Sequence, residues 1–180
     1  MEILPLPPLN TCVTSVSQPT AKDLYAMVDS ALARHPAACC ALSDGRVVVG
    51  ALTEHDLEVG IDLARKQVSD LKIGPIEVTY LGDPYPQEPY CRVVVTTPED
   101  YVGDVVGDLN RRVGCIETMD HVDGGFAVKC GVPLAQMIGY DLALSRTTRG
   151  RGRAEYAFIG YYRRVREVDP PLPPAVAARA

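Results

Sequence analysis

The chain has 180 residues, of which 47% are hydrophobic, and its formal net charge is −5. This length suits one ordinary domain or two small ones. No apolar run approaches the roughly 20 residues that a membrane-spanning helix needs, and the first residues, MEILPLPPLN, lack the basic start of a signal peptide. We therefore expect a cytoplasmic globular protein that binds no membrane.

The first half of the chain predicts the element order βαββαβ. A strand is expected at 11–17 and a helix at 21–34, whose apolar residues recur at helical spacing. Two apolar arms, AACCAL and RVVVGAL, flank the turn residues SDG and predict a hairpin. Thr53 and Asp56 are spaced as a helix cap, and PIEVTYL ends this half as a strand.

The second half repeats this order. The strand YCRVVVTT leads into TPEDYVGDVVGDLNRRVG, which contains three glycines but no lysine that could hold a phosphate. Its apolar residues follow helical spacing and predict a helix: Val102, Val105, Val106, Leu109 and Val113. A hairpin from CIETMD and GFAVKCGV, a short helix PLAQMIGY and a last strand AEYAFIGYYRRV follow. We predict an α+β fold of two tandem ferredoxin-like βαββαβ domains.

The predicted helix at 98–113 raises a question about its glycines. Thr97 with Asp100 is spaced as a cap, and Gly114 suits a left-handed helix end. Gly103 and Gly107 lie one turn apart, and each costs about 1 kcal/mol against alanine in a helix. Two explanations stay open: close backbone packing against the sheet, or a bare helix surface offered to another macromolecule.

Cysteines and histidines do not form a metal-binding pattern. The cysteines contain no CxxC pair and stand in apolar, strand-like surroundings: Cys12, Cys39, Cys40, Cys91, Cys115 and Cys130. This pattern favours reduced, buried thiols over a disulfide framework. His35 and His55 have no second ligand pair at the required spacing. We expect no metal site and no cofactor.

Basic residues gather late in the chain. The acidic excess lies in the first half, whereas SRTTRGRGR in the second half concentrates four arginines between two apolar segments: Arg146, Arg149, Arg151 and Arg153. Such a local cluster suits phosphate groups, and an ordinary solvated loop is the alternative.

Three segments of the second half are similar, in order and spacing, to the C-terminal domain of elongation factor G: PEDYVGDVVGDLNRRVG, GVPLAQMIGY and SRTTRGRG. The first half resembles the third domain of that factor more weakly, through RVVVGAL running into TEHDLEVGIDLARKQ and through IGPIEVTY. In the family, a fourth domain separates these two and a nucleotide-binding domain precedes both. The chain thus resembles an elongation factor reduced to two of its domains.

This resemblance and the proline pattern divide the chain into five segments. They are a leader at 1–9, a domain III-like unit at 10–82, a linker at 83–87, a domain V-like unit at 88–166 and a disordered Pro-rich tail at 167–180.

The resemblance implies binding without catalysis. GTP hydrolysis needs a phosphate loop ending in Gly-Lys-Ser or Gly-Lys-Thr, and no such sequence occurs in the chain. The implied partner is the ribosome, near the site where translational GTPases dock, and no DNA partner is expected. The four arginines would contact rRNA phosphates. A helix surface beside them would be presented by Asp104, Asp108, Asn110, Arg111 and Arg112.

A function of a different class stays open. Sheets of this fold also pair edge to edge and hold small molecules, so the alternative is a regulatory module that dimerises and binds a small ligand. The sequence leaves the oligomeric state undetermined.

Overall fold

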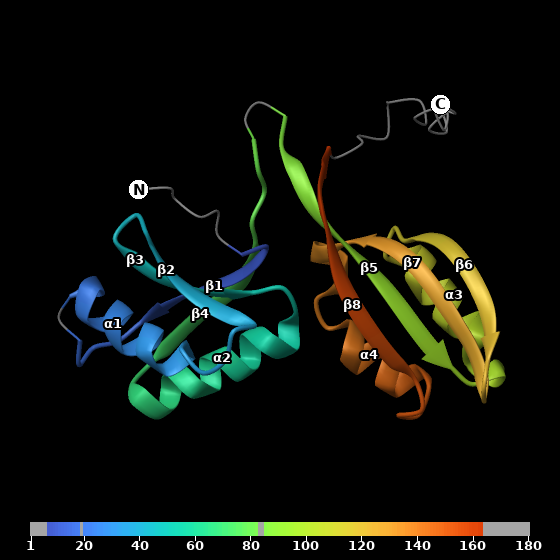
Figure 1. Ribbon diagram of the computed structural model, residues 1–180, viewed down its shortest axis with the longest axis horizontal. Helices are drawn as coiled ribbons and strands as arrows, with labels where there is room; N and C mark the ends of the chain where they lie inside the picture. The colour runs from blue at the N-terminus through green and yellow to red at the C-terminus, as the bar shows by residue number, and fades with distance from the viewer. Residues whose placement is uncertain (1–6, 19, 83–84, 164–180) are drawn as a thin grey trace.

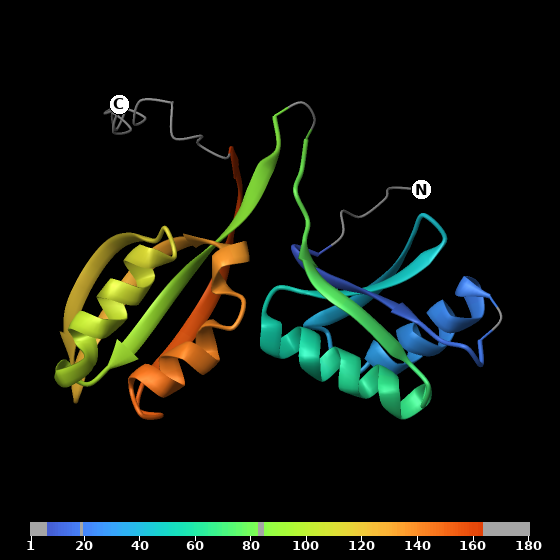
Figure 2. The ribbon, with the colours of Figure 1, turned by 180° about the vertical axis from the view of Figure 1, so that it is seen from behind.

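A computed structural model describes residues 7–18, 20–82 and 85–163. The chain forms two four-stranded antiparallel sheets, each covered on one face by a pair of helices (Figures 1 and 2). This arrangement confirms the predicted α+β fold of two ferredoxin-like units.

The first unit has the strand order β2-β3-β1-β4. Its elements are β1 (Leu9–Thr14), α1 (Ala21–Leu32), β2 (Ala38–Ser43), β3 (Arg46–Ala51), α2 (Glu54–Gln67) and β4 (Lys72–Val78). The Thr20 and Thr53 side chains cap the two helices by accepting from the backbone N–H groups of Asp23 and Asp56. The cap predicted at Thr53 is therefore confirmed.

The second unit repeats the order as β6-β7-β5-β8. Its strands are β5 (Gln87–Thr97), β6 (Cys115–Val122), β7 (Gly125–Pro133) and β8 (Arg153–Arg163), and its helices are α3 (Val102–Arg111) and α4 (Tyr140–Thr147). Two 3₁₀ turns, η1 (Glu99–Tyr101) and η2 (Leu134–Met137), precede the helices. Gln87, expected in the linker, begins β5, and its backbone hydrogen-bonds in both directions with that of Leu81.

Each unit buries one apolar core between its sheet and its helices. Alternate residues of the central strands face the helices, as the period of two in a strand requires. In the first unit Val13 and Leu57 have no exposed surface, and Val93 and Leu109 have none in the second.

The ends of α3 differ from the prediction. Thr97 does not cap the helix, because it is buried as the last residue of β5 and the chain enters α3 through η1. The left-handed residue is Val113, with φ of +60°, and not Gly114. Gly114 is required for space instead, since a Cβ there would lie 2.6 Å from the Cys130 Sγ and 2.8 Å from the Leu109 carbonyl oxygen. Val113 is 67% exposed and does not join the buried stripe.

The helix predicted at PLAQMIGY is also misplaced. Within this segment Leu134–Met137 form η2, and α4 begins at Tyr140 after Gly139, whose φ of +73° is left-handed. The helix therefore extends into the arginine-rich segment that the sequence places in a loop.

The cysteines are all free thiols, as expected, but only Cys91 and Cys130 are buried. Cys39 and Cys115 are exposed, because they lie on strand positions that face away from the cores. Within the described ranges, no helix is long and apolar enough to cross a membrane.

Candidate nucleic-acid interface

The arginine-rich segment from Arg146 to Arg153, here called the basic loop, joins α4 to β8. Its anchor is Thr148, a buried residue whose hydroxyl donates to the Leu144 carbonyl at 2.7 Å and accepts from the Gly152 N–H at 2.8 Å. Gly152 must be glycine, since a Cβ would lie 2.8 Å from that hydroxyl. The loop therefore has a defined shape.

The backbone of the basic loop adopts an uncommon conformation at Arg149 and Gly150. Arg149 and Gly150 both have positive φ, at +54° and +76°, and the Gly150 N–H donates to the Ser145 carbonyl at 2.7 Å. Left-handed residues commonly end helices in this way, but an arginine in this region costs roughly 1–2 kcal/mol. The fold thus holds the Arg149 side chain outward at an energetic cost.

The arginines of the basic loop are exposed and have no carboxylate partner among the described residues. Arg146, Arg149, Arg151 and Arg153 are all exposed, and among the residues that the structure describes none has an acidic oxygen within 4.0 Å. Free guanidinium groups offer several N–H donors in a planar fork that matches phosphate oxygens. The segment therefore carries concentrated positive charge that is not neutralised locally.

Arg151 is held in place by an aromatic ring. Its guanidinium carbon lies 4.8 Å from the centroid of the Tyr101 ring, and one of its N–H groups donates to the Tyr101 hydroxyl. Tyr101 ends η1, so the contact joins the start of α3 to the basic loop. The sequence analysis missed Tyr101, because 50 positions separate the two residues and nothing in the local pattern pairs them.

Arg153 points in another direction. It is the first residue of β8 and opposes Thr96 of β5. Opposing residues share a face of a sheet, and alternate residues of β5 place Arg92 on that face as well. Arg153 therefore lies on the open face of the second sheet, where Arg92 is paired with Glu117 at 3.1 Å.

The residues predicted on α3 separate into two groups. Arg112 is only 19% exposed: it donates to the Asp108 carboxylate at 2.9 Å and lies over the Tyr140 ring at 5.0 Å. Its guanidinium also donates to the Gln136 carbonyl oxygen in η2. Arg112 and Asp108 therefore hold α3 against η2 and α4 and are not a free surface.

The outer side of α3 is bare, in contrast. Asp104 and Asn110 are exposed, as is Arg111, whose side chain is 75% exposed. A Cβ at Gly103 or Gly107 would meet no atom within 4 Å, so neither glycine packs against the sheet. Of the two explanations for these glycines, close packing is wrong.

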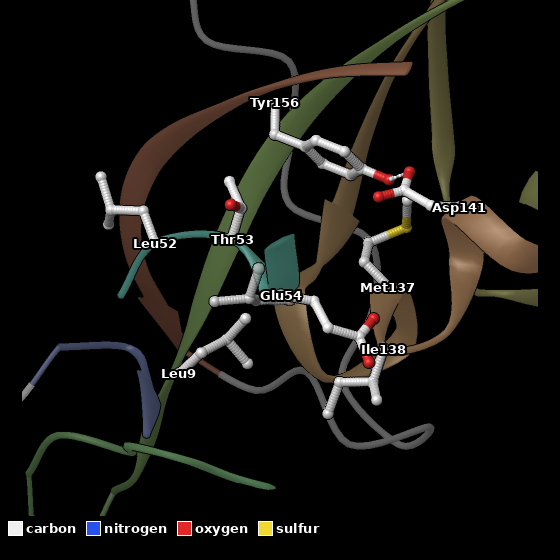
Figure 3. Close-up of a pocket in the computed structure, with 9 residues that line it drawn as sticks. Leu9, Leu52, Thr53, Glu54, Met137, Ile138, Asp141 and Tyr156 are labelled. Carbon is white, nitrogen blue, oxygen red and sulfur yellow. Dashed lines mark hydrogen bonds between the residues drawn. The ribbon is translucent and has the colours of Figure 1, made fainter. Parts of the chain in front are cut away.

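A small pocket lies where the two units meet (Figure 3). Leu9, Leu52, Thr53 and Glu54 line it from the first unit, and Leu134, Met137, Ile138, Asp141 and Tyr156 line it from the second. The Glu54 carboxylate accepts a hydrogen bond from the Gly139 N–H at 2.7 Å. The cavity volume of about 20 Å³ holds about one water molecule, so the small ligand of the alternative function does not fit here.

The polar pair in this pocket is Tyr156 and Asp141. The Tyr156 hydroxyl donates to the Asp141 carboxylate. Burial, followed by this hydrogen bond, raises the pKa of Tyr156 far above its ordinary value, so the phenol stays protonated. Within the described residues, no group of three or more His, Cys, Asp and Glu side chains could hold a metal ion.

The second unit is similar in sequence to a known family, and the whole chain is similar in fold to a solved structure. Residues 86–169 match the family described as elongation factor G C-terminus. A crystal structure of a protein from Thermus thermophilus is similar in fold over 91% of this chain, with a TM-score of 0.61 and 15% sequence identity. The chain spans 42% of that protein's length. The matched residues include α3, α4 and the basic loop, so the second unit is similar to the C-terminal domain of elongation factor G.

Proposed function

We propose that this protein is a non-catalytic, translation-factor-related protein that binds the ribosome through rRNA phosphates. The observation that carries the proposal is the basic loop, with four exposed arginines and no carboxylate partner among the described residues. The family match of residues 86–169 supports a translational context. The lack of a phosphate-loop sequence supports a role without GTP hydrolysis.

The shape of the loop supports phosphate binding in particular. Thr148 fixes the loop and Tyr101 orients the Arg151 guanidinium, so both are ordered before a partner arrives. Less side-chain entropy is then lost on binding, which raises affinity for a given set of contacts. Arginine pairs with phosphate through two parallel N–H donors.

The bare side of α3 is proposed as a second contact of a different kind. Asp104, Asn110 and Arg111 are exposed there, with glycine backbone between them. A carboxylate repels phosphate, so this mixed surface suits a protein of the ribosomal factor site better than rRNA. Asp108 and Arg112 support this surface from within and make no direct contact.

Co-sedimentation with purified ribosomes over a range of salt concentrations tests the proposal. Replacing Arg149 and Arg151 with alanine should weaken the association and lower its dependence on log salt by about one unit of slope per lost contact. The matched control replaces Arg65 and Lys66 on α2, two exposed cations of the first unit, and should leave both quantities unchanged. If the variant of Arg149 and Arg151 and the variant of Arg65 and Lys66 show the same association and the same salt dependence, the basic loop is not the contact.

A further inference from the structure

Aromatic side chains gather where two strands of the second sheet extend beyond the others. The pairing of β5 with β7 ends at Tyr90, whereas its pairing with β8 continues to Gln87 and Arg163. Figures 1 and 2 show this extension as an arm above the sheet. The chain has nine tyrosines and two phenylalanines, and six of these residues lie in or beside the arm: Tyr80, Tyr85, Tyr90, Phe158, Tyr161 and Tyr162.

The strand register assigns these rings to two faces. Phe158 opposes the buried Cys91, and after a bulge Tyr161 opposes Pro89 and Arg163 opposes Gln87. Phe158, Tyr161 and Arg163 therefore share the face on which the helices lie. Tyr162 opposes Glu88 on the other face and packs edge to face against Tyr90, with ring centroids 5.4 Å apart.

The helix-side face carries two pairs of planar groups. The Phe158 and Tyr161 rings lie edge to face with centroids 5.5 Å apart, and the Arg163 guanidinium carbon lies 4.8 Å from the centroid of the Tyr85 ring. We call these four residues the aromatic row. Tyr85 is 66% exposed and Phe158 is 37% exposed, so ring surface is open to a partner.

The charge of the arm is also one-sided. Arg163 is exposed and has no carboxylate oxygen within 4.0 Å in the part of the chain that the structure describes. The acidic residue of the arm, Glu88, is buried and lies on the opposite face, opposite Tyr162. The aromatic row therefore combines open rings with an unneutralised cation.

We infer that the aromatic row binds unpaired bases of single-stranded RNA. Aromatic rings stack on bases of any sequence, and a nearby arginine adds cation–π and phosphate contacts. The exposed rings offer flat surfaces that match bases, and the Arg163 guanidinium complements the charge of a nucleic-acid strand. The choice of RNA over DNA rests on the proposed function, but the mode of binding differs: the basic loop contacts phosphates, and the row needs bases that are not paired.

Titration of the full chain with RNA tests this inference. The probes are a ten-nucleotide oligouridine and an RNA duplex of the same length, followed by anisotropy of a labelled strand. The chain has no tryptophan, so its emission comes from tyrosine, and the part of the quenching that Tyr85→Leu removes reports stacking at the row. Phe158→Leu and Tyr85→Leu should each weaken binding of the single strand about tenfold and leave duplex binding unchanged.

Two matched controls separate stacking from a change in folding. Tyr162→Leu removes an exposed ring from the other face of the same arm and should change the affinity less than twofold. Tyr85→Phe keeps the ring and should retain the affinity of the parent. Urea unfolding of each variant identifies any that is destabilised, and Tyr85→Leu is the decisive variant because its ring lies outside the core.

The outcomes distinguish this inference from the proposed function. It is wrong if Tyr162→Leu weakens binding as much as Phe158→Leu does, or if the parent binds the single strand no more tightly than the duplex. In the second case a protein remains as the occupant of the row. Alanine at Arg149 and Arg151 should lower the affinity for both RNAs alike. If it changes neither while the row variants behave as expected, the proposed function fails and the aromatic row stands.

Discussion

The guanidinium of Arg151 lies over the ring of Tyr101, with 4.8 Å between its central carbon and the ring centroid. The contact joins the entrance of α3 to the basic loop, two segments that are distant in sequence. It orients a cation that would otherwise sample many rotamers, at a position where the loop meets solvent.

Loss of the Tyr101 ring should therefore weaken RNA binding without removing a charge. A cation–π contact at an exposed site contributes about 0.5–1 kcal/mol, so Tyr101→Leu should lower ribosome affinity roughly two- to fivefold. Tyr101→Phe keeps the ring and should lose less. Sedimentation at one salt concentration measures both variants, and equal losses would assign the effect to the hydroxyl contact instead.

Two glycines of the α3 region should respond to alanine in opposite directions. A Cβ at Gly107 meets nothing within 4 Å, so Gly107→Ala should raise the free energy of unfolding by about 0.5–1 kcal/mol through helix propensity. A Cβ at Gly114 meets a backbone carbonyl at 2.8 Å, so Gly114→Ala should lower it by about 1–3 kcal/mol. Urea denaturation compares the two variants, and a shift of the same sign in both would contradict the packing described for α3.

The turn after β1 should lose stability in acid through Asp70. Its carboxylate accepts from the Ser15 and Ser17 hydroxyls at 2.7 Å and from the Val16 and Ser17 N–H groups at 2.8 Å. These hydrogen bonds, those of the Ser15 and Ser17 hydroxyls first, hold the pKa of Asp70 well below its usual range. The pKa of Asp70 is lower in the folded state than in the unfolded state. The folded state is therefore fully stabilised by this carboxylate at pH values above the unfolded pKa, about 3.9.

This stabilisation is lost as the pH falls from about 4 toward the folded pKa. The difference in unfolding free energy between the parent and Asp70→Asn should therefore be constant from neutral pH to about pH 5 and shrink below about pH 4. Denaturant unfolding at several pH values measures it. A difference that grows in acid would mean that the carboxylate is not the acceptor in the folded state.

GTP should not bind to this chain. No phosphate-loop sequence, with a glycine followed by Gly-Lys-Ser or Gly-Lys-Thr five positions later, occurs in it. Calorimetric titration with GTP and magnesium should give only the heat of dilution. Saturable binding in the micromolar range would require a nucleotide site of a kind that the sequence does not contain.

Local patterns were enough to predict the fold. The hairpin at Asp44 and the cap at Thr53 are each determined by neighbouring residues, and the structure confirms them. The element order that follows from them defines both sheets. The misplaced end of α3 has a long-range cause, because Gly114 faces Cys130 of β7, which no local pattern reveals.

The roles of the candidate-site residues were harder to predict, because they also depend on contacts between residues that are distant in sequence. A cluster of arginines is visible in the sequence, but the partners that decide each arginine's role are not. Asp108 and Tyr140 hold Arg112 inside the fold, whereas Tyr101 presents Arg151 to solvent. Both outcomes depend on contacts with residues distant in sequence, Tyr140 for Arg112 and Tyr101 for Arg151, whereas the sequence alone predicted both arginines to contact the partner.

The course of β8 gives the two proposed RNA contacts a fixed separation. The strand starts at Arg153 in the basic loop and ends at Arg163 in the aromatic row. At about 3.3 Å per residue, its ends lie about 33 Å apart, and pairing with β5 keeps that distance constant. Arg153 and Arg163 lie on opposite faces of the sheet, so an RNA that engages both proposed contacts would have to span this distance and pass around the edge of β8. Binding of such an RNA at one end of β8 raises its effective concentration at the other end, which increases the overall affinity. The paired strand is rigid, so no flexible linker lowers that concentration.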